Sequence, residues 1–125
     1  MNTPQPLHRQ LLGKRGEDIA ASYLQRQGYR IVFRNFKARY GELDIVALDQ
    51  NTLVFVEVKT RVGTQYGTPE EALTPRKIRE LVKTAQFFTL THPTFPEEQR
   101  MDAIAIEMNS QEEIVRLNHI KNITG

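Results

Sequence analysis

The pattern of hydrophobic and polar positions predicts two amphipathic helices. Between residues 7 and 27 apolar side chains recur at helical spacing, and Gly28 supplies a stop signal. A second helical pattern follows Thr74 and Pro75, which are typical of an N-cap and a first helical position, and it continues to about Leu90. Each pattern has one apolar face, so each helix is expected to pack that face against the rest of the protein.

Apolar segments elsewhere predict five strands, at residues 29–36, 42–48, 52–59, 101–108 and 114–117. In the first strand Ile31 and Phe33 alternate with Val32, which places these two side chains on one face. A short polar loop joins the second and third strands and predicts a hairpin. Residues 62–69 hold two glycines and a proline without periodicity, which predicts an irregular loop.

The order of these elements predicts the fold class. Three strands after the first helix suit an antiparallel meander, and the second helix is long enough to cross over and place the fourth strand parallel to the third. We therefore expect an α/β protein with a central mixed sheet flanked by helices, in the order α-β-β-β-α-β-β. The length predicts a single domain over residues 1–125, with a core at about 8–119 and polar tails at both ends.

Composition excludes several kinds of site. The 125 residues include no cysteine, which excludes disulfides, thiolate zinc sites and cysteine nucleophiles and fits a reducing compartment. No apolar run approaches the length of a membrane span, and residues 1–6 lack the apolar stretch of a secretory signal, so a cytoplasmic location is expected. His8, His92 and His119 have no metal or triad spacing and are expected to be ordinary surface residues.

Acidic and basic residues at two-residue spacing provide the candidate chemistry. Glu57 and Lys59 lie two positions apart on the predicted third strand, so both side chains leave the same face. Glu42 and Asp44 are likewise two apart on the preceding strand, and the short loop allows either of them to face Glu57. Two carboxylates beside a lysine suit a hard divalent cation with activated water, and the lysine would orient that water or offset charge on the phosphate.

Ion pairing without metal is the alternative for this cluster. Surface ion pairs are common and contribute only about 0–1 kcal/mol. However, Phe55 precedes Glu57 on its own face, and a strand this apolar is expected to be covered on both faces. Glu17 also falls on the helix face that should pack against the sheet, so it needs a partner there. A metal, a lysine or an arginine would serve, and a buried ion pair stays open.

The segment Gly41–Val46 followed by Phe55–Arg61 resembles the YraN family of uncharacterised bacterial proteins, within the restriction-endonuclease-like, or PD-(D/E)xK, superfamily. The resemblance covers residues 10–108. Leu43-Asp44 occupies the position of the Pro-Asp pair that gives the superfamily its name. A lone ExK triplet is a weak motif, whereas an acidic residue on the preceding strand together with the flanking glycines is much more specific.

This resemblance implies a site like that of archaeal-type Holliday-junction resolvases. Asp44 and Glu57 would be the metal ligands, joined by the backbone carbonyl of Val58. Lys59 would be the catalytic lysine and Glu17 an assisting acid, with Mg²⁺ or Mn²⁺ as the cofactor. The implied reaction is hydrolysis of phosphodiesters in structured or branched DNA, and the spacing also leaves Glu42 as an additional acid.

A cluster of basic and polar residues predicts the surface that contacts nucleic acid. A formal net charge of +2 is only a mild lean toward polyanions, so the placement of charge matters more. The predicted contacts are Arg39, Arg61, Gln65, Tyr66, Arg76, Lys77 and Arg79. Those at the start of the second helix oppose the helix dipole, and a phosphate there would accept both the free amides and the basic side chains. A solvated basic helix end is the alternative.

Three functions therefore remain open. The first is a metal-dependent endonuclease-like protein acting on structured or branched DNA. The second is a non-catalytic nucleic-acid-binding module in a repair, recombination or DNA-uptake assembly, and the third is a protein-interaction domain with a buried ionic network. Binding of divalent cations separates the third from the others, and symmetric cleavage of two strands would favour a homodimer.

Overall fold

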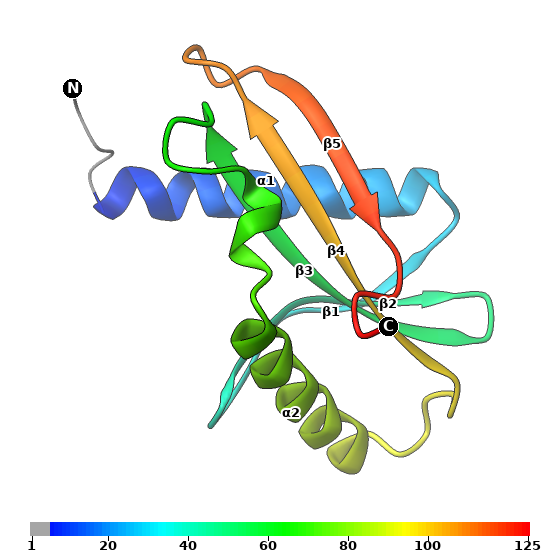
Figure 1. Cartoon of the computed structure of the whole chain (residues 1–125). Helices are drawn as coiled ribbons and strands as arrows, with labels where there is room; N and C mark the ends of the chain where they lie inside the picture. Colours follow the sequence, from blue (N-terminus) through cyan, green and yellow to red (C-terminus); the bar gives the residue numbers. More distant parts are fainter. Residues whose placement is uncertain (1–5) are drawn as a thin grey trace.

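The computed structural model describes residues 6–125, so the first five residues of the predicted N-terminal tail lie outside the described residues. The elements are α1 (Pro6–Arg26), β1 (Arg30–Ala38), β2 (Gly41–Asp49), β3 (Thr52–Val62), the 3-10 helix η1 (Pro69–Ala72), α2 (Pro75–Thr91), β4 (Gln99–Met108) and β5 (Ile114–Ile120). Figure 1 shows their arrangement. The predicted order is confirmed, and η1 is an addition within the segment between β3 and α2.

Local signals set the helix ends as predicted. Gly28 follows α1 with φ +93°, a left-handed conformation that glycine adopts without strain, and the chain then turns into β1. At the start of α2 the Thr74 hydroxyl accepts a hydrogen bond from the backbone N–H of Lys77 at 3.2 Å, with Pro75 at the first helical position. No helix within residues 6–125 is long and apolar enough to cross a membrane.

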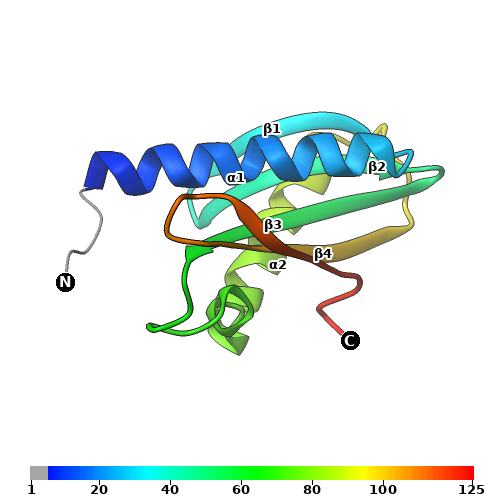
Figure 2. The same cartoon turned by 90° about the horizontal axis from the view of Figure 1, so that it is seen from above.

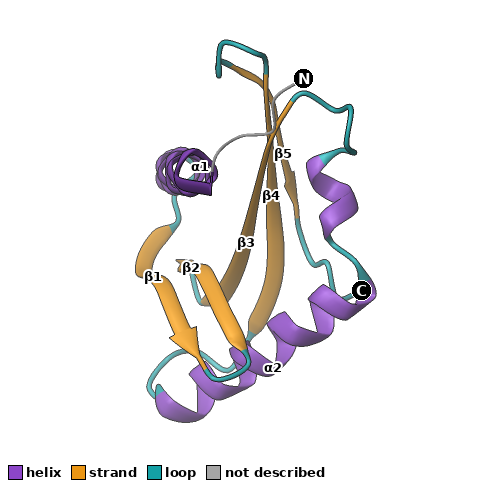
Figure 3. Ribbon diagram, turned by 90° about the vertical axis from the view of Figure 1, so that its left-hand side faces the viewer, coloured by secondary structure: helices purple, strands orange, loops and turns teal. Residues whose placement is uncertain are grey.

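The five strands form one mixed sheet in the order β1-β2-β3-β4-β5. All neighbouring strands are antiparallel except β3 and β4, which α2 connects as a parallel pair. The helix α1 lies on one face of the sheet and α2 on the other, as the views in Figures 2 and 3 show. The predicted α/β class with a mixed sheet flanked by helices is confirmed.

Each face of the sheet has its own hydrophobic cluster, because the side chains of β3 alternate between the two faces. Val56 packs on the α1 side with Leu24 and Ile104. Phe55 packs on the α2 side with Phe88. All five side chains are at most 2% exposed. Burying a large apolar side chain contributes about 1.5–3 kcal/mol, so these contacts clamp β3 between the two helices.

The first strand departs from the predicted alternation. Ile31 pairs with Ala47 and Phe33 with Val46, so Val32 is an extra residue that forms a β-bulge. The bulge turns Phe33 to the α2 side of the sheet, where its ring centroid lies 5.4 Å from that of Phe88. The prediction that Ile31 and Phe33 share a face is therefore wrong, because strict alternation assumes a regular strand.

His119 is also placed differently from the prediction of a surface residue. Its side chain is 7% exposed, with Nε2 2.9 Å from Asp102 Oδ2 and Nδ1 3.0 Å from the Tyr23 hydroxyl. Asp102 is fully buried and also accepts hydrogen bonds from Arg100 Nε at 2.9 Å and from the backbone N–H of Asn122 at 3.0 Å. The polar network ties α1 and the C-terminal segment to β4, so this tail is held on the sheet.

Candidate active site

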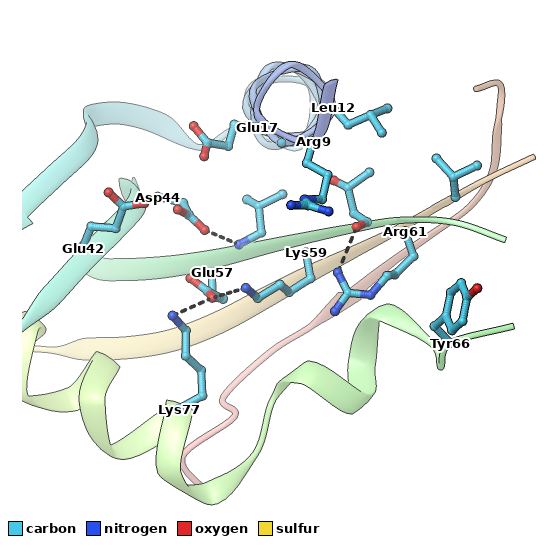
Figure 4. Close-up of a pocket in the computed structure, with 14 residues that line it drawn as sticks. Arg9, Leu12, Glu17, Glu42, Asp44, Glu57, Lys59, Arg61, Tyr66 and Lys77 are labelled. Carbon is cyan, nitrogen blue, oxygen red and sulfur yellow. Dashed lines mark hydrogen bonds and ion pairs between the residues drawn. The ribbon is translucent and has the colours of Figure 1, made fainter. Parts of the chain in front are cut away.

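A pocket of about 590 Å³ lies between α1, the diverging ends of β2 and β3, the loop after β3 and the start of α2 (Figure 4). Its lining consists of Arg9, Leu12, Gly13, Glu17, Glu42, Asp44, Glu57, Val58, Lys59, Thr60, Arg61, Val62, Tyr66 and Lys77. Charged side chains therefore come from both helices and from two adjacent strands.

The innermost contact of the pocket joins Asp44 to Val58. The registered pairing of β2 with β3 ends at Ile45 and Val56. Beyond that pair, Asp44 Oδ2 accepts a hydrogen bond of 2.8 Å from the backbone N–H of Val58. The side chain thus takes the place of a β2 carbonyl. Because the N–H and C=O of one strand residue point to the same side, the Val58 carbonyl also leaves β3 toward the side where β2 has ended its pairing.

Glu57 is surrounded by two lysines from different elements. Its side chain is only 3% exposed, and its Oε2 lies 3.5 Å from Lys59 Nζ and 3.5 Å from Lys77 Nζ. Lys59 follows on the same face of β3, whereas Lys77 reaches across from the first turn of α2, as Figure 4 shows. The predicted approach of a lysine to Glu57 is present, and the structure adds a second one.

Burial and a neighbouring negative charge both act on the carboxylate of Asp44. Burial, and after it the neighbouring Glu57 carboxylate, raise the pKa of Asp44 to about 8, while the hydrogen bond from Val58 opposes the shift. Two buried carboxylates in contact repel each other when both are ionised, and removing them from water adds to the cost. The pair therefore favours a bound proton or a bound cation.

The two other predicted acids lie nearer the rim. Glu17 lines the pocket from α1, and burial raises its pKa while Arg34 opposes the shift. Glu42 also lines the pocket but is exposed, so Asp44 rather than Glu42 is the residue of that strand buried beside Glu57. The sequence left open whether Glu42 or Asp44 faces Glu57. The point at which β2 separates from β3 selects Asp44.

The predicted nucleic-acid contacts divide into two groups. Arg61, Tyr66 and Lys77 line the pocket. The residues absent from its lining are Arg39, Gln65, Arg76 and Arg79, all of which are exposed. The division within α2 follows from about 100° of rotation per residue, which points Lys77 at the sheet and leaves Arg76 and Arg79 in solvent. Arg76, for example, pairs with Glu80 at 3.6 Å on the outer surface.

Several lining residues had no place in the sequence prediction. Arg9, Gly13 and Glu17 follow one another at four-residue intervals on α1, so helical spacing from Glu17 was a signal that could have found Arg9. Thr60 had no such signal. It packs against Gly16, where an added Cβ would lie 1.9 Å from the Thr60 hydroxyl oxygen, so the helix approaches β3 closely at this position.

Oxygen donors suited to a hard cation converge at the bottom of the pocket. The carboxylates of Asp44 and Glu57 are buried together beside the Val58 backbone, and the raised pKa of Asp44 reflects first its burial and then the adjacent negative charge of Glu57, which a cation would offset. Within residues 6–125, no three His, Cys, Asp or Glu side chains are grouped to hold a metal ion. Mg²⁺ commonly uses only one or two carboxylates and completes its coordination with water and phosphate, so two carboxylates and a carbonyl fit its chemistry.

Fold and pocket together define a small α/β protein with a buried pair of carboxylates and two lysines at the point where two strands separate. The model of the uncharacterised protein family UPF0102, the YraN family, matches residues 16–106, and the chain belongs to this family. A UPF0102 protein of Geobacter sulfurreducens is 49% identical over 115 residues, covering 92% of this chain and 89% of the relative. One from Persephonella marina is 46% identical over 110 residues, covering 88% and 90%. The predicted family is confirmed.

Proposed function

We propose that the pocket is the active site of a Mg²⁺- or Mn²⁺-dependent endonuclease-like protein of the restriction-endonuclease-like superfamily. Its substrate would be a phosphodiester of structured or branched DNA. The observation that carries the proposal is the burial of Asp44 and Glu57 in contact, beside Lys59, where β2 stops pairing with β3. The acidic residue, the ExK triplet and their order along the chain also match the superfamily motif.

Asp44, Glu57 and the Val58 carbonyl would hold the cation. A bound Mg²⁺ or Mn²⁺ would supply an activated water and neutralise charge on the phosphate. The contribution of the protein is to fix the two carboxylates. Asp44 is oriented by the Val58 N–H at 2.8 Å, and Glu57 is enclosed so that its side chain is 3% exposed. This arrangement positions the ligands before the cation arrives, which reduces the ordering cost of binding.

Lys59 and Glu17 have supporting roles in the proposed reaction. The Lys59 ammonium lies 3.5 Å from Glu57 with its side chain 31% exposed, so it can reach the pocket interior from a fixed strand position. There it would orient the attacking water and stabilise negative charge that develops on the phosphate. Glu17 faces the same space from α1, and its raised pKa suits an acid that takes up and releases a proton.

The acidic pocket favours catalysis over simple binding. Glu17, Glu42, Asp44 and Glu57 all line the space where a phosphate would sit, and carboxylates repel phosphate unless a cation lies between them. Arg61 and Tyr66 at the rim would contact the DNA backbone and bases. A surface that only binds nucleic acid has no need of buried carboxylates facing the ligand.

The test is Mn²⁺-dependent cleavage of linear, flapped and four-way-junction DNA by the wild-type protein, Asp44→Asn and Lys59→Ala. Lys83→Ala is the matched control, because this exposed lysine of α2 lies outside the pocket and is not one of the predicted nucleic-acid contacts. We expect cleavage by the wild type and the control, and a loss of about a hundredfold or more in the other two variants. The preferred substrate of the panel would identify the DNA structure that is recognised.

Two results would contradict the proposal. DNA binding and a heat of Mn²⁺ binding without cleavage of any substrate would favour the non-catalytic binding module. Absence of cleavage and of Mn²⁺ binding, with strong destabilisation by Lys59→Ala, would favour the protein-interaction domain with an ionic network.

The proposal extends to assembly and location. A homodimer would suit symmetric cleavage of two strands, and sedimentation with and without a four-way junction would measure it. The absence of cysteine fits the reducing cytoplasm, where cellular DNA would be the substrate.

A further inference from the structure

Lys77 occupies an unusual place for a residue at the beginning of a helix. It lies in the first turn of α2, where its backbone N–H is capped by the Thr74 hydroxyl at 3.2 Å. Positive charge there opposes the helix dipole and costs about 0.3–1 kcal/mol at low salt. Helix stability therefore does not account for a lysine at this position, and its side chain crosses to the sheet instead of entering solvent.

Two ammonium groups meet one buried carboxylate oxygen in this protein. Lys59 Nζ and Lys77 Nζ each lie 3.5 Å from Glu57 Oε2, and each lysine side chain is 31% exposed. Lys59 is directed there by strand alternation alone, since Glu57 lies two positions before it on β3. Lys77 belongs to a separate element, so its approach depends on how α2 docks against the sheet. Arg76 beside it is 85% exposed and pairs with Glu80 outside the pocket.

From this geometry we infer that Lys77 is a second lysine of the active site: it neutralises Glu57 in the free protein and moves to the substrate phosphate when a divalent cation binds the carboxylates. The inference rests on the proposed function. A lysine ammonium is a compact charge with three donors on a flexible stem. A cation beside Glu57 repels that ammonium, and the stem allows it to turn into the pocket, where phosphate oxygens accept its hydrogen bonds.

Opposite effects on metal binding and on cleavage distinguish this role from a structural one. Removing the charge of Lys77 leaves Glu57 with one ammonium fewer, so a cation binds to a more negative site. The same change removes a donor to the phosphate, so the reaction slows. If the role of Lys77 were purely structural, its substitution would loosen the pocket and weaken both cation binding and cleavage.

The experiment compares wild type, Lys77→Met, Lys77→Arg and the control Lys83→Met, because methionine keeps the length of the stem without its charge and Lys83 is an exposed lysine of α2 outside the pocket. Mn²⁺ binding without DNA is measured by titration calorimetry, and cleavage is measured on the best substrate of the panel. For Lys77→Met we expect about fivefold tighter Mn²⁺ binding, the effect of about one unit charge a few ångströms away, and cleavage about tenfold slower or more. Lys77→Arg restores wild-type Mn²⁺ affinity and part of the cleavage, and Lys83→Met matches wild type in both.

Separate results overturn the inference and the proposed function. If the wild type binds Mn²⁺ and cleaves DNA but Lys77→Met binds Mn²⁺ no more tightly, or cleaves at the wild-type rate, the inference is wrong and the active site stands. If the wild type neither binds Mn²⁺ nor cleaves, the proposed function fails and the inference fails with it. Urea unfolding of each variant identifies a folding defect, and loss of folding in Lys77→Met but not in Lys77→Arg would assign Lys77 a structural role.

Discussion

The carboxylate of Asp44 accepts a hydrogen bond from the backbone N–H of Val58 at 2.8 Å, just beyond the last registered pair of β2 and β3. A side chain thus completes the backbone hydrogen bonding of β3 where the neighbouring strand turns away. The same separation makes room for the pocket and brings Asp44 against Glu57. Sheet geometry and the candidate chemistry therefore have one structural cause.

The stability of the free protein should depend on pH through Asp44. Burial and the neighbouring Glu57 carboxylate raise the pKa of this residue from 3.8 to about 8, so between those pH values the folded state binds more protons than the unfolded state and stability falls as pH rises. Asp44→Asn removes the titrating group and keeps an oxygen acceptor for Val58. We expect the free energy of unfolding of wild type, relative to Asp44→Asn, to fall by about 3–4 kcal/mol from pH 5 to pH 8. Urea unfolding in the presence of a chelator measures this difference. If the free energies of unfolding of wild type and Asp44→Asn changed with pH in parallel, the prediction would be wrong.

Divalent cations should reverse that loss of stability. A ligand that binds only the folded state at a hundred times its Kd stabilises it by about 2.7 kcal/mol. We expect saturating Mn²⁺ at pH 8 to raise the Tm of wild type, and excess chelator to return it to the starting value. Asp44→Ala and Glu57→Ala should show no rise, because they remove a ligand. An equal rise in both variants would place the cation elsewhere on the protein.

The effects of substitutions at Gly16 and Thr60 on the free energy of unfolding should be coupled. A Cβ at Gly16 would lie 1.9 Å from the Thr60 hydroxyl oxygen, which is buried and has no hydrogen-bond partner among the described residues. Gly16→Ala should therefore destabilise the protein by about 1–3 kcal/mol through overpacking. Adding Thr60→Ala should recover much of that loss, since the obstructing hydroxyl is removed.

A double-mutant cycle by urea unfolding measures this coupling. Gly13→Ala is the control, because an added Cβ at Gly13 meets no atom within 4 Å and the helix gains up to about 1 kcal/mol in propensity. Equal destabilisation by both glycine variants would show that the close approach to Thr60 is not the cause.

The local stability of residues 63–74, the segment between β3 and α2, should depend on an ion pair outside the pocket. Glu70 of η1 accepts hydrogen bonds from Arg116 of β5 at 2.8 Å and from Asn118 at 2.9 Å, and the hydrogen bonds from Arg116 lower the pKa of Glu70 to about 2. The anchoring is complete above the ordinary pKa of 4.5 and is lost as pH falls toward 2. Glu70→Gln should increase hydrogen exchange at neutral pH in residues 63–74, which include Tyr66.

The exposed Glu71 of the same turn offers the matched control for this anchoring. Glu71→Gln should leave exchange in residues 63–74 near the wild-type level. Unchanged protection in Glu70→Gln would show that the loop is held by other contacts, such as the burial of Pro69.

The sequence by itself determined the elements and much of the candidate site. Hydrophobic periodicity located both helices and all five strands, and Thr74 with Pro75 marked the start of α2 correctly. Strand alternation placed Glu57 and Lys59 on one face, and the short hairpin brought an acid of β2 beside them. These features follow from local geometry, in which the spacing of residues along a helix or strand fixes the direction of their side chains.

Only the tertiary structure decided how separate elements meet. The choice of Asp44 over Glu42 depends on where β2 leaves β3, and the bulge at Val32 redirects Phe33. The presence of Lys77 in the pocket depends on the docking of α2. Distances between elements result from the packing of many side chains and from the twist of the sheet, which local periodicity does not encode. For that reason the residue types of the candidate site could be predicted, and Lys77 among its contacts, whereas the pairing of Lys77 with Glu57 could not.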